Sequence, residues 1–439
     1  MSIRRCFYSF VITIIASAAH AGENWPGWRG PTGMGQTDEI NLPVIWGGKT
    51  QQNVLWKAAI FPSDEVERDH NQSSPTVWGD RVFVTVSYWP QGLTRKDFSE
   101  HHLLCFSAKD GKKLWDTSIQ PGPWKLSDFR GGGYACSSPA TDGRHIYAVF
   151  GSAVIAAVDF DGAIAWRKEI KPHDFDVAFA ASPVIYHSPQ PQGDGRGVRG
   201  GIVILVCDQM NKSSTIYAFD GKTGEIHWES RRPKVNWSHS TPLLANINNK
   251  LQLITATHNG PHGLDPATGA TLWFFHESRQ VGDTVTPIVR DGLLYVDSGR
   301  GGMGIAVDAT GSGDVSKTHL KWSVPKVPEG FSSPVLVGDY LYRLHGPGLL
   351  TCLKWKTGEK VFQDRLDGVE TACSPIATPD GRIYCASAGR SYVLKARPTL
   401  EILARNDLGD ASKASPAVAR GRIYLKGGRH LFCVGVKND

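Results

Sequence analysis

The sequence contains no segment with a sustained helical period of apolar residues. It has 48 glycines and 26 prolines in 439 residues, and these separate short runs of β-branched and aromatic residues. Short alternating runs bounded by turn residues are typical of β-strands. The missing helical period argues against helical and mixed folds, and the pattern that remains predicts an all-β protein.

Blocks of like charge and membrane-length apolar segments are also missing. No run of five like charges occurs, and the net charge of +6 gives no reason to expect a nucleic-acid partner. The apolar segment 7–19 is too short to span a bilayer. Arg4 and Arg5 before it and Ala19-His20-Ala21 at its end predict a signal peptide over residues 1–21. We expect a periplasmic or secreted protein cleaved near Ala21, with the ordinary and the twin-arginine export routes both open.

Familiar catalytic and metal-binding motifs are scarce. C-x-x-C-H, H-E-x-x-H and a nucleophile-centred G-x-S-x-G do not occur. The G-x-G-x-x-G match at 299–304 precedes a strand-like run at 305–308, whereas a dinucleotide site needs a helix there. His258 and His262 have helical metal spacing, but Gly260-Pro261 between them forbids that helix. We expect no metal site.

The cysteines after the predicted signal peptide show no adjacent pair and no close-spaced ligand pattern. Several of them recur at the same position of the sequence repeat that is described below. Equivalent positions of different repeats lie too far apart for a disulfide. We expect buried free thiols at seven positions: Cys105, Cys136, Cys207, Cys352, Cys373, Cys385 and Cys433.

A set of eight Ser-Pro or Thr-Pro dipeptides, each followed by a similar segment, recurs along the chain at intervals of 41 to 64 residues. Periodicity in this range indicates a propeller, a solenoid or an array of repeats. The eight dipeptides are Ser74-Pro75, Ser138-Pro139, Ser182-Pro183, Thr241-Pro242, Thr286-Pro287, Ser333-Pro334, Ser374-Pro375 and Ser415-Pro416.

Each repeat predicts four short strands. A Gly/Asp turn follows the first strand, and a second Gly-containing turn precedes a last strand with a large apolar residue. This residue is Trp115, Trp166, Trp228 and Trp273 in four repeats, each four residues after the turn glycine. A large ring at one constant position predicts packing between neighbouring repeats.

The eighth repeat ends without its tryptophan strand. A matching strand with Trp56 lies near the start of the chain, at residues 53–60. Pairing of this strand with the last sheet would close a ring and protect its edges. The sequence therefore predicts an eight-bladed β-propeller with four-stranded blades over residues 53–439, closed by an N-terminal strand, with residues 22–52 as an extension that packs on it.

The repeat resembles that of the pyrroloquinoline quinone (PQQ) type propellers. Its clearest copies are residues 223–228 and 267–273, and the resemblance covers residue 53 to the C-terminus. Residues 25–31 resemble the opening of secreted members of this family. The resemblance implies relationship to quinoprotein dehydrogenases and to outer-membrane assembly-factor propellers, which use the ring as a protein-docking scaffold.

The dehydrogenase resemblance also implies a cofactor site, which this sequence matches poorly. In those enzymes the quinone stacks between a Trp and a disulfide of adjacent cysteines, beside a calcium held by Glu, Asn and Asp. This chain has no Cys-Cys pair and no motif for the calcium ligands. PQQ remains a candidate cofactor only through the resemblance.

The candidate site lies at one mouth of the predicted central channel. In a propeller, the loops that enter the first strand and those that join strands two and three share one face, here called the loop face. Their cations, amides and rings suit an anionic or polar aromatic ligand. The candidate residues are Arg130, Tyr134, Trp237, His239, Arg300, Arg390, Lys413 and Arg429.

Fold alone does not assign an activity. We expect a monomeric, non-catalytic binding or scaffold protein that takes a protein partner or a small polar or anionic ligand at the channel mouth. A face with no specific ligand stays open. The runner-up is a PQQ-dependent oxidoreductase with an atypical site.

Overall fold

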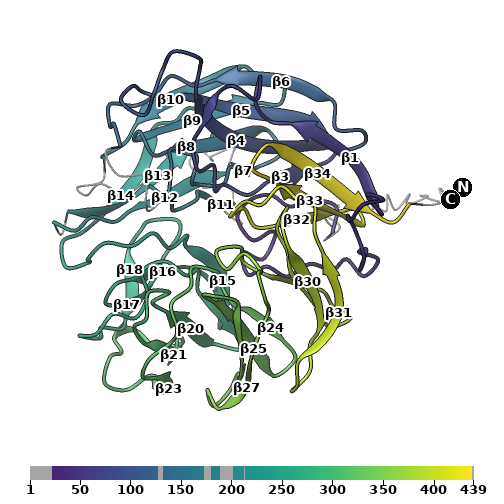
Figure 1. Ribbon diagram of the computed structural model, residues 1–439. Helices are drawn as coiled ribbons and strands as arrows, with labels where there is room; N and C mark the ends of the chain where they lie inside the picture. Colours follow the sequence, from purple (N-terminus) through teal and green to yellow (C-terminus); the bar gives the residue numbers. More distant parts are fainter. Residues whose placement is uncertain (1–21, 127–131, 173–178, 188–200, 212, 438–439) are drawn as a thin grey trace, which may run out of the picture.

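The computed structural model describes residues 22–126, 132–172, 179–187, 201–211 and 213–437 (Figure 1). The predicted signal peptide at 1–21 and the candidate Arg130 lie outside these residues. Nearly all regular structure in the described segments is β-strand, and none of them forms a helix of the length and apolarity that a membrane crossing requires.

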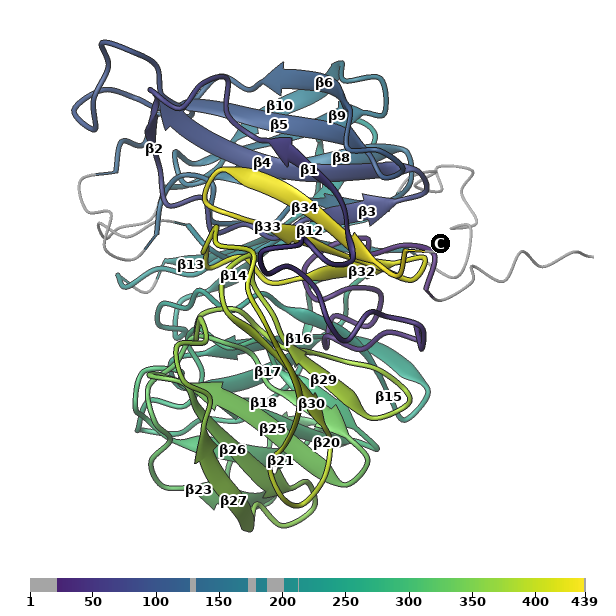
Figure 2. The same ribbon diagram turned by 45° about the vertical axis from the view of Figure 1, so that its right-hand side comes forward.

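Eight sheets surround a common centre, so the predicted all-β, eight-bladed propeller is confirmed (Figures 1 and 2). Each blade runs antiparallel from an inner strand at the centre to an outer strand. The first four blades comprise β3 (Thr76–Trp78), β4 (Arg81–Trp89), β5 (Glu100–Ser107) and β6 (Lys113–Ser118); β7 (Ala140–Thr141), β8 (His145–Phe150), β9 (Val154–Asp159) and β10 (Ile164–Glu169); β11 (Val184–Tyr186), β12 (Ile202–Cys207), β13 (Ser214–Asp220) and β14 (Ile226–Arg232); β15 (Leu243–Ile247), β16 (Lys250–Thr257), β17 (Gly260–Leu264) and β18 (Thr271–Phe274).

The last four blades follow the same order. They comprise β19 (Ile288–Arg290), β20 (Leu293–Asp297), β21 (Gly304–Asp308) and β23 (Leu320–Val324); β24 (Val335–Val337), β25 (Tyr340–His345), β26 (Leu349–Lys354) and β27 (Lys360–Arg365); β28 (Ile376–Ala377), β29 (Arg382–Cys385), β30 (Ser391–Lys395) and β31 (Glu401–Asn406); β32 (Ala417–Ala419), β33 (Arg422–Lys426), β34 (His430–Gly435) and β1 (Val54–Ala59). Two short strands extend blades 1 and 4, namely β2 (Glu67–Arg68) on β4 and β22 (Gly313–Asp314) on β18.

The N-terminal strand closes the ring as predicted. β1 pairs antiparallel with β34, with Trp56 opposite Cys433 and Ala58 opposite Leu431. Its register shifts just before Trp56, and the outer strands of the other blades shift at the same point. β1 is therefore the outer strand of blade 8 in geometry as well as in sequence.

At five inter-blade interfaces the repeated tryptophan contacts the turn glycine of the next blade, whereas the Trp273 indole donates to Gln252 of its own blade. The indole of Trp56 donates to the Ala108 carbonyl at 3.1 Å, and Trp115 donates to Phe160 at 2.9 Å. Each of these two rings also covers the turn glycine of the neighbouring blade. At Gly111 φ is +75° and a Cβ would lie 2.6 Å from the Trp56 ring, so the turn requires glycine both for its conformation and for space.

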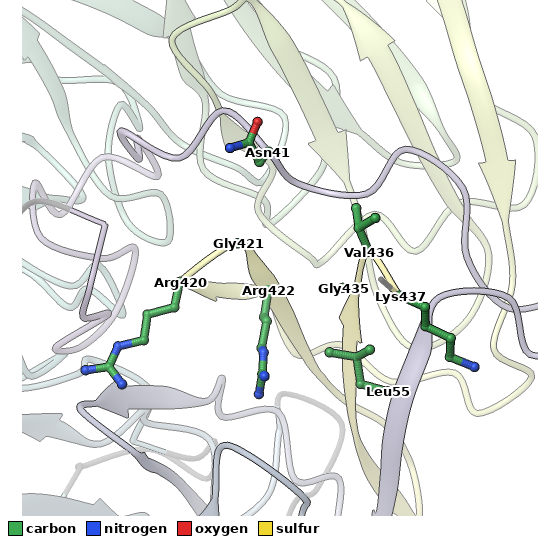
Figure 3. Close-up of a pocket in the computed structure, with 8 residues that line it drawn as sticks. All are labelled: Asn41, Leu55, Arg420, Gly421, Arg422, Gly435, Val436 and Lys437. Carbon is green, nitrogen blue, oxygen red and sulfur yellow. The ribbon is translucent and has the colours of Figure 1, made fainter. Parts of the chain in front are cut away.

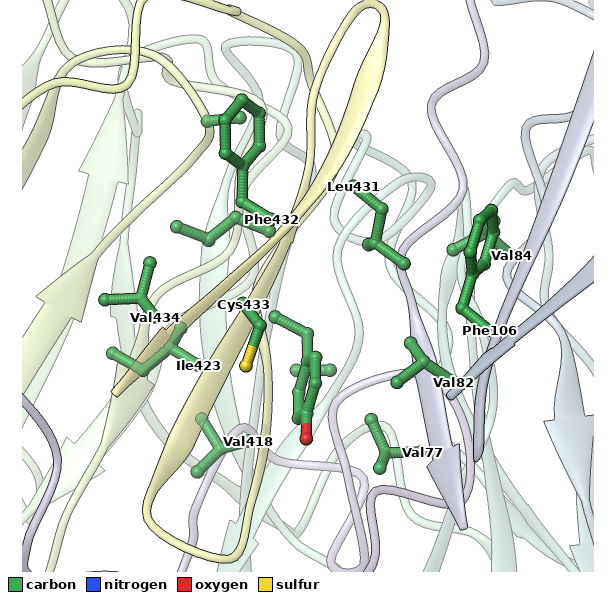
Figure 4. Close-up of a cluster of buried hydrophobic side chains, with 14 of the residues drawn as sticks. Val77, Val82, Val84, Phe106, Val418, Ile423, Leu431, Phe432, Cys433 and Val434 are labelled. Atoms are coloured by element: carbon green, nitrogen blue, oxygen red, sulfur yellow. The ribbon is translucent and has the colours of Figure 1, made fainter. Parts of the chain in front are cut away.

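Apolar side chains fill the spaces between blades. At the closure, Val77, Val82 and Val84 of blade 1 face Val418 and Leu431 of blade 8, and all five are buried (Figure 4). The same cluster includes Trp25, Leu42 and Trp46, which precede the propeller in sequence.

Two buried cations also bridge inter-blade interfaces. Arg343 of blade 6 forms a bidentate pair with Asp297 of blade 5, with N–O distances of 2.7 and 3.0 Å. Lys426 of blade 8 donates to the Ser73 hydroxyl at 2.6 Å and to the Thr85 carbonyl of blade 1 at 2.9 Å. Burial lowers the pKa of Lys426 to about 7.

The segment before β1 crosses the ring on the face opposite the loop face. Trp25 bridges to Val77 of blade 1, and the Thr141 amide of blade 2 donates to the Pro26 carbonyl at 2.8 Å. The buried Arg29 donates to the Ser333 carbonyl of blade 6 at 3.0 Å. Gln36 bridges to Ala377 of blade 7. We call residues 25–37 the strap.

Removal of the closing strand should expose the edge of β34. A chain that begins at residue 61 is expected to lose amide protection along residues 430–435 and to aggregate on heating, because an unpaired edge is a template for intermolecular pairing. A chain that begins at residue 53 keeps β1 and is the control. Hydrogen exchange and light scattering measure both effects, and equal protection of β34 in the two chains would contradict the closure.

Candidate functional site

The hydroxyls of the Ser-Pro and Thr-Pro dipeptides form a hydrogen-bonded ring around the central channel. In seven of the eight inter-blade steps, the hydroxyl of one blade accepts the backbone N–H of its counterpart in the preceding blade. These bonds are Ser74 N to Ser138 Oγ at 2.8 Å, Ser138 to Ser182 at 3.0 Å, Ser182 to Thr241 at 2.9 Å, Thr286 to Ser333 at 3.0 Å, Ser333 to Ser374 at 2.8 Å, Ser374 to Ser415 at 2.8 Å and Ser415 to Ser74 at 2.9 Å.

The remaining step, between blades 4 and 5, is different. Thr286 Oγ1 accepts the indole N–H of Trp28 at 2.8 Å, and the described residues show no bond to it from the Thr241 amide. At this step a side chain of the strap, and not the backbone N–H of the preceding blade, is the hydrogen-bond donor to the hydroxyl. Trp28 also borders the central cavity and forms part of its floor.

The cavity has a volume of about 520 Å³. Because the strap crosses the opposite face and Trp28 borders the cavity, we infer that the cavity opens toward the loop face. The residue two positions before each dipeptide lines it in all eight blades. These residues are Gln72, Cys136, Ala180, His239, Thr284, Phe331, Ala372 and Lys413, and we call them the inner ring. Four of the dipeptide hydroxyls, Trp28 and Arg300 complete the lining. The volume lies within the range of small-ligand sites.

The lining is cationic. Lys413 and Arg300 border the cavity, and no Asp or Glu is among its lining residues. Asp283, next in sequence to the lining residue Thr284, is buried, and burial raises its pKa to about 7. With two cations and no acidic side chain among its lining residues, the cavity favours anions.

Trp237 lies beside this cavity at the centre of a group of basic side chains. The Arg300 guanidinium lies 5.1 Å from its ring centroid, in cation–π geometry. The rings of His239 and His258 lie 5.5 and 5.8 Å away. Burial and the charge of Arg300 lower the pKa of His258. The indole thus holds Arg300 at the cavity edge.

The structure brings together some of the predicted site residues and separates others. His239, Arg300 and Lys413 line one cavity, and Trp237 supports Arg300. Tyr134 is fully buried, and its hydroxyl accepts the Leu126 amide at 3.0 Å, so it offers no ring face to a ligand. Its side chain is not among the residues that line the cavity.

Two predicted arginines lie away from the cavity. Arg429 forms an ion pair with Asp64 at 3.0 Å. Arg390 borders a separate hollow with Trp46, Tyr392 and Arg405. Shared position in the repeat places both on loops between second and third strands, but their side chains do not line the cavity. Arg130 lies outside the described residues.

Sequence reasoning missed Phe331, Thr284, Cys136 and the floor residue Trp28. The first three share a signal that was available in the sequence, since each lies two residues before a dipeptide. No repeat signal could have found Trp28, because it precedes the propeller.

A third hollow lies at the closure of the ring, lined by Arg420, Arg422, Lys437, Leu55 and other residues (Figure 3). Arg420 pairs with Asp80 at 2.6 Å, and Arg422 donates to the Ala108 carbonyl at 2.5 Å. Both arginines therefore connect blade 8 to blade 1, which is a structural role.

A quinone with a calcium ion does not fit the described residues. They contain no group of three or more His, Cys, Asp or Glu arranged to hold a metal ion. Cys136 lines the cavity but is unpaired, as are the six other cysteines described. The cavity matches the charge of a planar polyanion through Lys413 and Arg300, but it lacks a disulfide against which a quinone could stack.

Comparisons with known proteins identify relatives of the fold. The family model described as outer membrane protein assembly factor BamB matches residues 99–364, which is more than half of the chain. BamB from Moraxella catarrhalis is 17% identical, with coverage of 87% of this chain and 98% of that chain and a TM-score of 0.57. Quinohemoprotein alcohol dehydrogenase from Comamonas testosteroni is 14% identical, with coverage of 95% and 81% and a TM-score of 0.62.

The computationally designed Ika8 protein is also similar, at 11% identity, 87% and 99% coverage and a TM-score of 0.54. No curated protein sequence matches the chain significantly. At these identities the likeness to the solved structures concerns the fold alone.

The hydrogen bond from Trp28 to Thr286 should contribute measurably to the free energy of unfolding. Trp28→Phe removes the indole donor and leaves the Thr286 hydroxyl without it, so the free energy of unfolding should fall by about 1 kcal/mol. Trp124→Phe is the matched control, since no described residue accepts a hydrogen bond from the buried Trp124 Nε1. Urea denaturation measures both variants, and equal losses would contradict a specific role for the bond.

Asp283 should make stability depend on pH. Because its pKa of about 7 in the folded protein exceeds the unfolded value of about 3.9, its favourable contribution is complete below pH 4 and is lost as pH rises through 7. Asp283→Asn should therefore raise the melting temperature relative to the unmodified protein more at pH 8 than at pH 4.5. Asp64→Asn, at an exposed ion pair, is the control. A pH-independent effect of Asp283→Asn would contradict the assignment.

Proposed function

Because the chain belongs to the family described as outer membrane protein assembly factor BamB, we propose that it is a non-catalytic scaffold that docks a protein partner on its loop face. The observation that carries the proposal is the inner ring. Eight blades of one rigid fold present eight chemically varied side chains around one cavity, and the strap forms its floor. Function commonly resides in such loop residues on a rigid scaffold.

The composition of the face supports binding rather than catalysis. The predicted residues His239, Arg300 and Lys413 provide hydrogen-bond donors and positive charge, and Phe331 adds an exposed ring. General acid–base catalysis would require a positioned acid and base next to a reacting atom. We assign no such pair, and we derive no catalytic step.

Location and assembly state are part of the same proposal. Export by the predicted signal peptide at 1–21 would place the mature protein in the periplasm or outside the cell. We further propose that the protein is a monomer. A small anionic ligand in the cavity is compatible with docking, because the partner would contact the surrounding loops.

Site-specific photocrosslinking tests the docking face. A photoreactive residue in place of Arg429, on the loop face, is expected to form one discrete adduct in cells that express the protein natively. The same residue in place of Lys222, in an exposed turn on the opposite face, is the control and should form none. Equal adducts from both faces would contradict the proposal.

Reconstitution with PQQ and Ca²⁺ tests the runner-up oxidoreductase. We expect no steady oxidation of primary alcohols or sugars with a dye acceptor, and any PQQ binding should weaken as salt rises because it depends on surface charge. Steady turnover that Arg300→Gln abolishes would favour the enzyme and overturn the scaffold.

A further inference from the structure

Several surface arginines of the protein form ion pairs with carboxylates. Arg429 pairs with Asp64, Arg420 with Asp80 and Arg382 with Asp380. By contrast, neither Lys413 nor Arg300 forms an ion pair among the described residues; both side chains are exposed, and the carboxyl near Arg300, that of Asp283, is buried. Their charge is therefore available to a ligand that enters from the loop face.

An apolar contact point lies in the same cavity. Phe331, the inner-ring residue of blade 6, is 47% exposed, whereas phenylalanines such as Phe83 and Phe106 are buried. Exposed aromatic rings within a polar surface are typical anchors of protein interfaces. Phe331 thus offers a hydrophobic surface close to two cations.

The shape of the cavity limits what can enter. Ala180 of blade 3 and Ala372 of blade 7 leave the inner ring open on two sides, while Trp28 forms part of the floor. A volume of about 520 Å³ holds a few side chains and excludes a folded element. A loop tip or a chain end of a partner protein has the matching size.

We propose that the cavity receives an acidic segment of the docking partner, in which an Asp or Glu lies next to an apolar side chain. The carboxylate pairs with Lys413 and Arg300, and the apolar side chain packs on Phe331. This inference rests on the proposed docking function and names the partner's chemistry. Charge-assisted hydrogen bonds give it specificity, and the apolar contact adds affinity.

Selection from a random linear peptide library, displayed on phage, tests the inference on the intact mature protein. The selected sequences are expected to contain Asp or Glu beside Leu, Phe or another apolar residue. For a synthetic peptide of the most enriched sequence, Kd should rise about tenfold with either Lys413→Gln or Arg300→Gln, since each change removes one charge-assisted contact. Phe331→Ala should weaken binding at both low and high salt, whereas the effects of the charge variants should diminish at high salt.

Lys222→Gln, in a turn on the opposite face, is the control and should leave the peptide affinity unchanged. Basic or uncharged selected sequences, or binding that survives the double change Lys413→Gln and Arg300→Gln, would overturn the acidic-segment inference. If a photoreactive residue at position 429 still formed its crosslink, either result would contradict the acidic-segment inference but not the proposed docking function. An empty selection counts against this inference, and loss of that crosslink counts against docking itself.

Discussion

A side-chain hydroxyl that reaches from one blade to the backbone of its neighbour holds the centre of this protein together. Seven such bonds, from Ser74 round to Ser415, connect neighbouring blades at the start of their inner strands. At five interfaces the outer strands add a second contact, the indole of one blade on the turn glycine of the next. The two sets together fix most blades at both their inner and outer edges, so the loops that they carry are held in a rigid frame.

The ring is not symmetric, and its asymmetry involves the strap. Between blades 4 and 5, Trp28 donates to the Thr286 hydroxyl in place of a neighbouring blade. The same segment contacts blades 1, 2, 6 and 7. It therefore ties the ring together and gives the channel a floor, which turns a passage into a cavity open to the loop face.

The proposed docking role uses the geometry of the fold. A propeller places equivalent positions of all blades around one axis, so eight independent residues can be varied without change to the frame. Here these positions carry Lys413, Phe331 and six smaller or neutral side chains. Their chemistry suits an acidic partner segment, while the described residues lack the metal-ligand group of a quinone enzyme.

The sequence by itself determined the number of blades, the closing strand and the role of the tryptophans, because these depend on local patterns that repeat along the chain. It also indicated His239, Arg300 and Lys413 as loop-face residues. Only the tertiary structure decided which loop side chains point inward, and it separated Arg390 and Arg429 from the cavity and buried Tyr134. The repeat fixes where a residue lies on its own blade, but its direction and partners depend on contacts with residues distant in sequence, such as Asp64 for Arg429. Trp28 is a further case, because it precedes the propeller in sequence and its partner Thr286 lies 258 residues away.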